Sequence, residues 1–66
     1  MESIRIDGKR YHTITQTAFI TGISREALYR RIKRRRLEAL KIGRYIFIEV
    51  KTVQQLTIEK LKGDLK

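Results

Sequence analysis

The chain has 66 residues, and its 16 Lys and Arg outnumber its seven Asp and Glu, giving a formal net charge of +9. This length supports one small domain with a marginal hydrophobic core, so residues 1–66 are predicted to form a single domain. The absence of cysteine and the presence of one histidine, His12, exclude a disulfide framework and a cysteine or histidine zinc site. No metal or cofactor is therefore expected.

No apolar run approaches the roughly 20 residues of a membrane-spanning helix. Residues 1–10 also lack the apolar core of a secretory signal peptide. We therefore expect an intracellular, cytoplasmic domain. The positive charge predicts a polyanionic partner that is bound through phosphate contacts and counterion release, which would place the protein at the nucleoid.

The positive charge is concentrated in residues 25–44, which hold nine basic and two acidic residues, a net charge of +7. Apolar residues interrupt this basic segment at regular intervals, as a folded element requires and a disordered tail does not. They are Ile23, Leu28, Ile32, Leu37, Leu40 and Ile42. The alternative interpretation is a solvated basic surface without a specific partner.

Residues 3–12 predict a β-hairpin, because Asp7-Gly8 favours a two-residue turn in which both residues take positive φ. This turn fixes the register of the pairs Ile6 with Lys9, Arg5 with Arg10, and Ile4 with Tyr11. The two arginines then oppose each other on one face, which is tolerable where that face meets solvent or phosphate. His12 is expected to be an ordinary surface residue.

Residues 13–34 predict two short helices. Thr13 and Gln16 have the spacing of a capping box, and Gly22 has the position of a left-handed helix end. Ser24 is expected to cap a second helix over residues 25–34. The apolar stripes of the two helices are predicted to be Ile14, Ala18 and Thr21, and then Ala27, Leu28 and Ile32. Two short helices joined by a glycine-containing turn predict a helix-turn-helix.

Residues 39–48 predict a second hairpin that turns at Gly43-Arg44, with both faces mostly apolar. One face is expected to pack on the helices, and the other to be covered by the first hairpin or by a second copy of the protein. Residues 51–62 predict a final helix that ends at Gly63. Its inward residues are predicted to be Val53, Leu56 and Leu61.

Residues 13–56, about two thirds of the chain, resemble the small winged helix-turn-helix domains of the excisionase family, within the wider MerR-like group. The matching positions are Ala18, Gly22-Ile23-Ser24-Arg25, Tyr29-Arg30, Ile32, Arg36-Leu37, Gly43-Arg44, Ile48 and Val53. This pattern is informative about fold and uninformative about biological process. The same module occurs in excisionases, transcription regulators, transposition proteins and phage packaging subunits.

The chain departs from the family pattern at three places. Arg35 occupies a position that is usually glycine with positive φ, so Arg35 is strained or the second helix ends differently. Glu38 and Glu49 replace two usual prolines. Ile46-Phe47 replaces a usual aromatic-basic pair, which indicates additional packing or a protein contact.

The resemblance implies two helix-turn-helix helices, a β-hairpin wing and a C-terminal helix. With the N-terminal β-hairpin, which lies outside the family pattern, the predicted fold is a small α+β winged helix-turn-helix. The second helix would enter the major groove of double-stranded DNA, near base edges or flanking phosphates. The side chains expected there are Ser24, Arg25, Glu26, Tyr29, Arg30 and Lys33. Glu26 has a second interpretation, because a carboxylate in the first turn stabilises a helix and pairs with Arg30.

The wing tip, with Lys41, Gly43 and Arg44, is expected to reach an adjacent minor groove or its phosphates. Arg34, Arg35 and Arg36 are expected to contact the DNA backbone and carry no base specificity. A domain of this size has a small DNA footprint, so we expect a dimer or a cooperative assembly on DNA. A recombinase or another protein is a further expected partner. The second wing strand and the C-terminal helix are the candidate contact surfaces.

The predicted function is sequence-preferring double-stranded DNA binding, in an excisionase-like accessory of recombination or in a small transcription regulator. One alternative is an RNA-binding module that stacks bases on Tyr11, Tyr45 and Phe47. Another is a protein-interaction adaptor, such as an antirepressor or a phage packaging subunit, whose basic face meets an acidic protein. Enzymatic activity is not expected, because no carboxylate pair, nucleophile-base pair or metal cluster is evident in the sequence.

Overall fold

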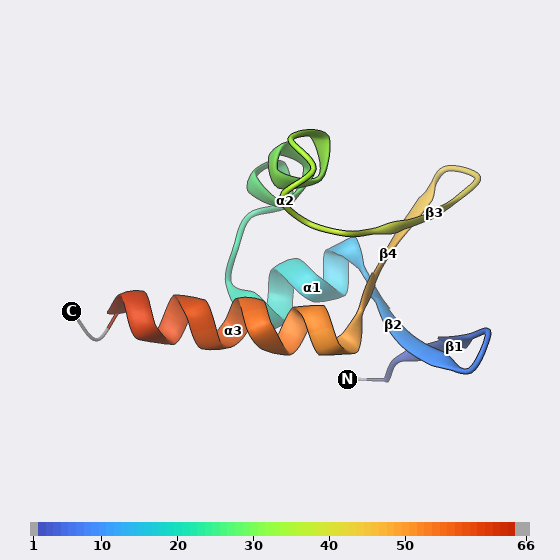
Figure 1. Ribbon diagram of the computed structural model, residues 1–66, viewed down its shortest axis with the longest axis horizontal. Coiled ribbons are helices and arrows are strands. Elements are labelled where there is room, and N and C mark those ends of the chain that lie inside the picture. The colour runs from blue at the N-terminus through green and yellow to red at the C-terminus, as the bar shows by residue number, and fades with distance from the viewer. Residues whose placement is uncertain (1, 65–66) are drawn as a thin grey trace.

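The computed structural model describes residues 2–64 and shows a small α+β fold with a four-stranded antiparallel sheet and three helices (Figure 1). Strands β1 (Ile4–Ile6) and β2 (Lys9–Thr13) precede helices α1 (Ile14–Thr21) and α2 (Arg25–Lys33). Strands β3 (Leu40–Ile42) and β4 (Tyr45–Glu49) then lead into helix α3 (Val50–Asp64). Helix α3 extends along one side of the molecule, and both α2 and the β3–β4 hairpin rise on the opposite side.

The two hairpins share a single curled sheet with the strand order β1-β2-β4-β3. Both hairpins were predicted, but their pairing into one sheet was not. Strand β2 pairs with β4, so that Tyr11 faces Glu49 and His12 faces Ile48. Within each hairpin the predicted turns and registers are confirmed, including the pairing of Arg5 with Arg10. Asp7 and Gly8 both have positive φ, 51° and 79°, as the two-residue turn requires.

Only one face of the sheet packs on the helices. Because successive strand residues point to opposite faces, His12, Ile46 and Ile48 share the inner face. The outer face is partly exposed, and the N-terminal hairpin does not cover it as expected, because β1 and β2 extend the sheet sideways. Exposed apolar residues on this outer face are Ile4, Ile42 and Tyr45.

Helix α1 begins with the predicted capping box: the Gln16 backbone N–H donates to Thr13 Oγ1 at 3.1 Å, and the Thr13 N–H donates to Gln16 Oε1 at 3.0 Å. The fully buried Thr17 donates its hydroxyl to the Thr13 carbonyl at 2.9 Å, which removes the cost of burying that hydroxyl. The helix ends at Gly22, whose φ of 73° gives the predicted left-handed residue. Lys60 of α3 donates to the Gly22 carbonyl at 3.0 Å, which ties this turn to α3.

Helix α2 ends in a Schellman motif whose two N–H donors both belong to arginines. The Arg36 N–H donates to the Arg31 carbonyl at 2.8 Å, and the Arg35 N–H donates to the Ile32 carbonyl at 3.0 Å. Arg35 takes the left-handed conformation that the motif needs, with φ of 58°. Of the two possibilities open for this position, the strained arginine is therefore the observed one.

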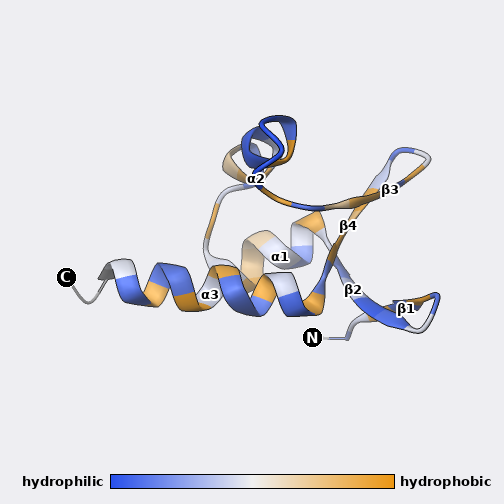
Figure 2. Ribbon diagram, viewed as in Figure 1, coloured by the Kyte–Doolittle hydropathy of each residue, from blue (hydrophilic) through white to orange (hydrophobic). Residues whose placement is uncertain are grey.

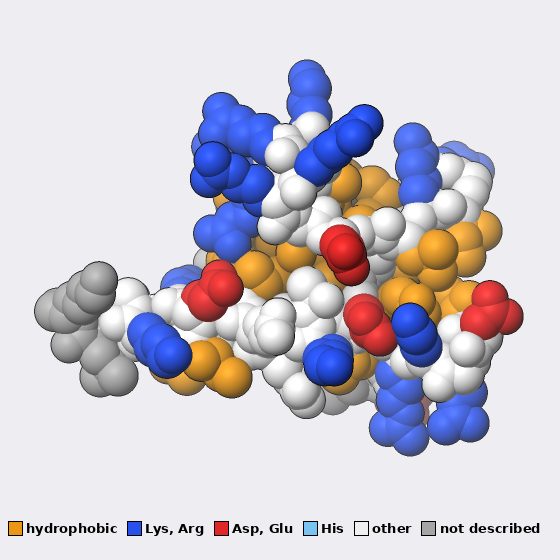
Figure 3. Space-filling model, in the orientation of Figure 1, with side chains coloured by type: hydrophobic (Ala, Val, Ile, Leu, Met, Phe, Trp, Pro, Cys, Tyr) orange, Lys and Arg blue, Asp and Glu red, His pale blue; other side chains and the backbone are white. Residues whose placement is uncertain are grey.

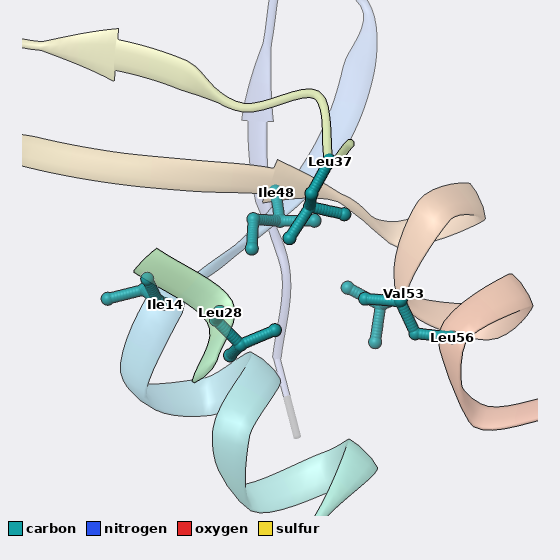
Figure 4. Close-up of a cluster of buried hydrophobic side chains, with 6 residues drawn as sticks. All are labelled: Ile14, Leu28, Leu37, Ile48, Val53 and Leu56. Carbon is teal, nitrogen blue, oxygen red and sulfur yellow. The ribbon is translucent and has the colours of Figure 1, made fainter. Parts of the chain in front are cut away.

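The core forms between the inner sheet face and the helices (Figures 2 and 4). Leu28 and Ile48 are fully buried at its centre, with 0% of their surface exposed. Among the residues that the structure describes, the buried apolar side chains are Ile14, Leu28, Leu37, Ile48, Val53 and Leu56. Each large aliphatic residue buried in this way contributes roughly 1.5–3 kcal/mol, so six of them leave little margin for loss in a chain of this size.

Three sequence-based expectations at single positions are wrong. His12 is buried, with 7% exposure, because the β2–β4 pairing places it on the inner sheet face beside Ile48. Leu61 is 57% exposed, because the part of α3 that carries it extends past α1 and the sheet. Gly63 does not stop α3, which continues to Asp64.

We predict that Arg35→Gly stabilises the fold by about 0.5–1 kcal/mol. Glycine removes the left-handed strain of roughly 1–2 kcal/mol and adds back a smaller entropic cost in the unfolded chain. Urea denaturation followed by circular dichroism measures the change. Arg34→Gly is the matched control: it removes the same charge at φ −85°, where glycine brings no relief, and should destabilise. Equal shifts in both variants would attribute the effect to charge alone.

Candidate nucleic-acid interface

Helix α2 presents its polar side outward because its apolar residues recur at helical spacing. Leu28 is buried and Ile32 packs against the core, so the residues on the opposite side of a helix with about 3.6 residues per turn face solvent. Those outward residues are Glu26, Arg30 and Lys33, all exposed. Arg25 and Tyr29, on one flank of the helix, are also exposed, and Tyr29 shows 45% of its surface.

Arg35 and the other ten side chains predicted from the sequence to contact DNA are all exposed. Six lie at the N-cap of α2 or within it, namely Ser24, Arg25, Glu26, Tyr29, Arg30 and Lys33. Arg34 and Arg36 follow in the turn that ends the helix, Lys41 lies in β3, and Arg44 lies in the β3–β4 turn. The structure thus groups eight of the ten around one short helix and two on one hairpin.

The N-terminus of α2 is well ordered by a local hydrogen bond. Ser24 Oγ accepts from the Ala27 N–H at 3.2 Å, which leaves its hydroxyl hydrogen available to an outside acceptor. Glu26 lies in the first turn, where its charge opposes the positive end of the helix dipole. The first turn therefore offers both a donor and an acceptor to whatever faces it.

The β3–β4 hairpin carries its basic residues toward the same side as α2. Lys41 pairs with Ile46 and therefore lies on the inner face of the sheet, the face that packs on the helices. Arg44 occupies the turn itself, next to Gly43 with φ of 58°. Figure 3 shows Lys and Arg side chains gathered over α2 and again at this hairpin tip, with apolar side chains between them.

Between α2 and α3 lies an open groove of about 490 Å³ that sequence reasoning did not anticipate. Four arginines line it together with one acidic side chain from α3. Its lining residues are Ala27, Arg30, Arg31, Arg34, Arg36 and Glu59. Arg31 was absent from the predicted site, although the spacing of Ala27, Arg31 and Arg34 places them on one flank of a helix. Glu59 enters only through tertiary packing, which the sequence pattern does not show.

The outer sheet face carries the aromatic residues considered for RNA. Tyr11, Phe47 and Tyr45 lie on the same face of the two central strands, and Tyr45 is 62% exposed. The rings of Tyr45 and Phe47 are in contact, with centroids 6.5 Å apart. An adjoining depression of about 190 Å³ mixes charges, since Lys9, Glu38 and Glu49 all line it.

Within residues 2–64, no group of three or more His, Cys, Asp or Glu side chains is placed to hold a metal ion. His12 instead lies 3.4 Å from Gln16, measured between Nδ1 and Oε1. None of the three helices, over the part of the chain that the structure describes, combines the length and apolar character needed to cross a bilayer.

Comparison of the chain with protein-family models, with curated proteins and with solved structures finds no match. The resemblance to winged helix-turn-helix domains therefore depends on the residues quoted for it.

We predict that Arg30→Ala leaves the free energy of unfolding within about 0.5 kcal/mol, because Arg30 is exposed and outside the core. Leu28→Ala, two positions earlier and fully buried, should cost roughly 2–5 kcal/mol. Thermal unfolding measured by circular dichroism tests both variants. A comparable loss from Arg30→Ala would show that this arginine supports the fold.

Proposed function

We propose that the protein binds double-stranded DNA in the manner of a winged helix-turn-helix, with α2 as the recognition helix and the β3–β4 hairpin as the wing. The observation that carries the proposal is the division of α2 into two sides. Its inner side supplies Leu28 to the core, and its outer side exposes Arg30, Lys33 and Glu26. Basic charge held on a rigid, convex helix fits a groove lined by phosphates.

The dimensions support insertion of α2 into the major groove. The groove is about 12 Å wide, and an α-helix with its side chains is about 10–12 Å across. In this arrangement Arg30 donates to guanine acceptors, and Glu26 accepts from a cytosine amino group. A carboxylate on a surface otherwise built to attract phosphate favours base contacts at that position, because it gains nothing from the backbone.

The wing supplies a second contact. Lys41 and Arg44 lie on the hairpin that rises on the same side of the molecule as α2. They are proposed to meet the adjacent minor groove or its phosphates, where an arginine reads groove width through electrostatic potential. Arg34, Arg35 and Arg36 are proposed to hold the backbone where α2 ends.

One domain of this size covers few base pairs, so we propose that copies bind side by side or as a dimer. Two exposed apolar surfaces are compatible with such contacts. One is the outer sheet face with Ile42 and Tyr45, and the other is α3 with Ile58 and Leu61.

Selection from a pool of random duplex DNA at two salt concentrations, followed by sequencing, tests the proposal. A motif that remains enriched at the higher salt supports base recognition by α2, and repeated half-sites in it reveal the arrangement of copies. Retention that disappears with salt and shows no motif contradicts base recognition and leaves backbone binding alone. A bending assay then separates an excisionase-like accessory, which bends DNA over adjacent sites, from a regulator that uses one palindrome.

We predict different effects for Arg30→Ala and Arg44→Ala. Loss of a base contact at Arg30 should cost about 1–3 kcal/mol of binding and relax the preference at one position. Loss of a phosphate or minor-groove contact at Arg44 should weaken binding evenly across sequences and reduce the salt slope by about 1. Fluorescence anisotropy over a salt series measures both quantities. Identical behaviour of the two variants would contradict separate roles for helix and wing.

Single-stranded RNA binding is the second candidate, favoured by the aromatic residues on the outer sheet face. Tyr11, Phe47 and Tyr45 share that face, as base stacking requires. Glu38 and Glu49 beside them oppose phosphate, which makes this the weaker proposal. Competition of labelled duplex with single-stranded RNA, using wild type and Tyr45→Ala, decides between the two surfaces.

A further inference from the structure

The groove between α2 and α3 gathers four arginines, of which Arg31 has no role in the DNA contacts proposed above. Arg30, Arg31, Arg34 and Arg36 all line it, and Ala27, the smallest lining side chain, opens it toward the α2 backbone. Arg31 is only partly exposed, whereas Arg34 and Arg36 are exposed. Four guanidinium groups around one depression repel one another, and an anion placed among them relieves that repulsion.

These arginines are not needed to end the helix. The carbonyl groups of Arg30, Arg31 and Ile32 already accept backbone N–H groups from residues 34–36. Within residues 2–64, none of the side-chain hydrogen bonds uses a guanidinium group. Their donors therefore face the groove and solvent. A guanidinium presents a planar fork of donors that matches two oxygens of one phosphate. Several such forks around one depression favour a phosphate as the ligand.

The groove lies on the flank of α2 away from the wing. Arg31 and Glu59 also line a second depression together with Leu56 and Lys60 of α3, so this flank faces α3. The β3–β4 hairpin lies on the other side of α2 (Figure 1). If α2 binds a DNA duplex, the wing would contact the duplex on one side of α2, and the arginine groove would contact it on the other side.

We propose that the arginine groove (lined by Arg30, Arg31, Arg34 and Arg36, with Glu59 from α3) binds a phosphodiester of the DNA backbone through Arg31, Arg34 and Arg36, on the flank of α2 opposite the wing, while Arg30 keeps its proposed contact with a base. This assignment rests on the proposed DNA-binding function and extends it. The protein then contacts DNA at three places. Helix α2 lies in the major groove, the wing contacts the backbone on one side, and the arginine groove contacts the backbone on the other side. Glu59 weakens the third contact, because its negative charge shares the groove with the incoming phosphate.

The presence of Glu59 makes the proposal testable by a gain of affinity. Glu59→Gln keeps the size of the side chain and removes its charge, so binding to a mixed-sequence duplex should tighten roughly two- to fivefold, the effect of one surface charge interaction. Glu49→Gln is the matched control: it changes the net charge equally, but Glu49 lies on the outer sheet face and does not line the groove. Fluorescence anisotropy at low salt measures both.

Removal of the cations should have the opposite effect. The double variant Arg31→Gln/Arg34→Gln should reduce the magnitude of the salt slope by about 0.9, the contribution of the one phosphate that the groove neutralises. The motif selected from random DNA should stay the same, since a phosphate contact carries no base information. Arg5→Gln/Arg10→Gln, two exposed changes on the paired strands β1 and β2, is the control that removes the same positive charge away from the groove.

The outcomes separate the groove from the DNA-binding function. Equal gains from Glu59→Gln and Glu49→Gln, or a salt slope unchanged in the arginine variant while wild type still selects a motif, would overturn the groove assignment and leave DNA binding standing. The groove would then be a surface for an acidic protein segment. Failure of wild type to retain duplex DNA at any salt would overturn both proposals together. Circular dichroism of each variant confirms that the comparison is between folded proteins.

Discussion

The antiparallel pairing of β2 with β4 is the contact on which the rest of the structure depends. It joins two hairpins from distant parts of the chain into one sheet and places His12 and Ile48 side by side on the inner face. Ile48 then reaches Leu28 of α2, and both are fully buried. Because only six apolar side chains form the buried core, loss of this pairing would remove the surface against which the helices pack.

The basic residues lie on the surface of the fold and do not contribute to its core. In the part of the chain that the structure describes, no Lys or Arg belongs to the core. The densest group of basic residues runs from α2 into a turn where Arg35 takes an unfavourable left-handed conformation. Crowded like charges and a strained arginine both reduce stability. The crowded basic residues and the strained Arg35 therefore lower stability in the region where we propose that DNA binds.

The proposed mode of binding depends on rigid placement of α2. Its N-terminus is capped by Ser24, its inner side is held by Leu28, and its C-terminus is closed by a Schellman motif. A helix fixed at both ends presents its outer side chains without the entropic cost of ordering its backbone on binding. The wing and the arginine groove lie on opposite sides of this helix, so electrostatic contacts on either side would set its orientation in a DNA groove.

Local features were determined by the sequence itself: the two tight turns, the capping box, the left-handed Gly22 and the apolar stripe of α2 depend on residues only a few positions apart. The exposure of the candidate DNA-contacting side chains follows from that stripe. The tertiary structure alone decided the burial of His12, the exposure of Leu61 and the groove that brings Arg31 to Glu59. These depend on which strands pair and on how α3 packs against α1 and the sheet, and such long-range packing leaves no mark in short-range periodicity.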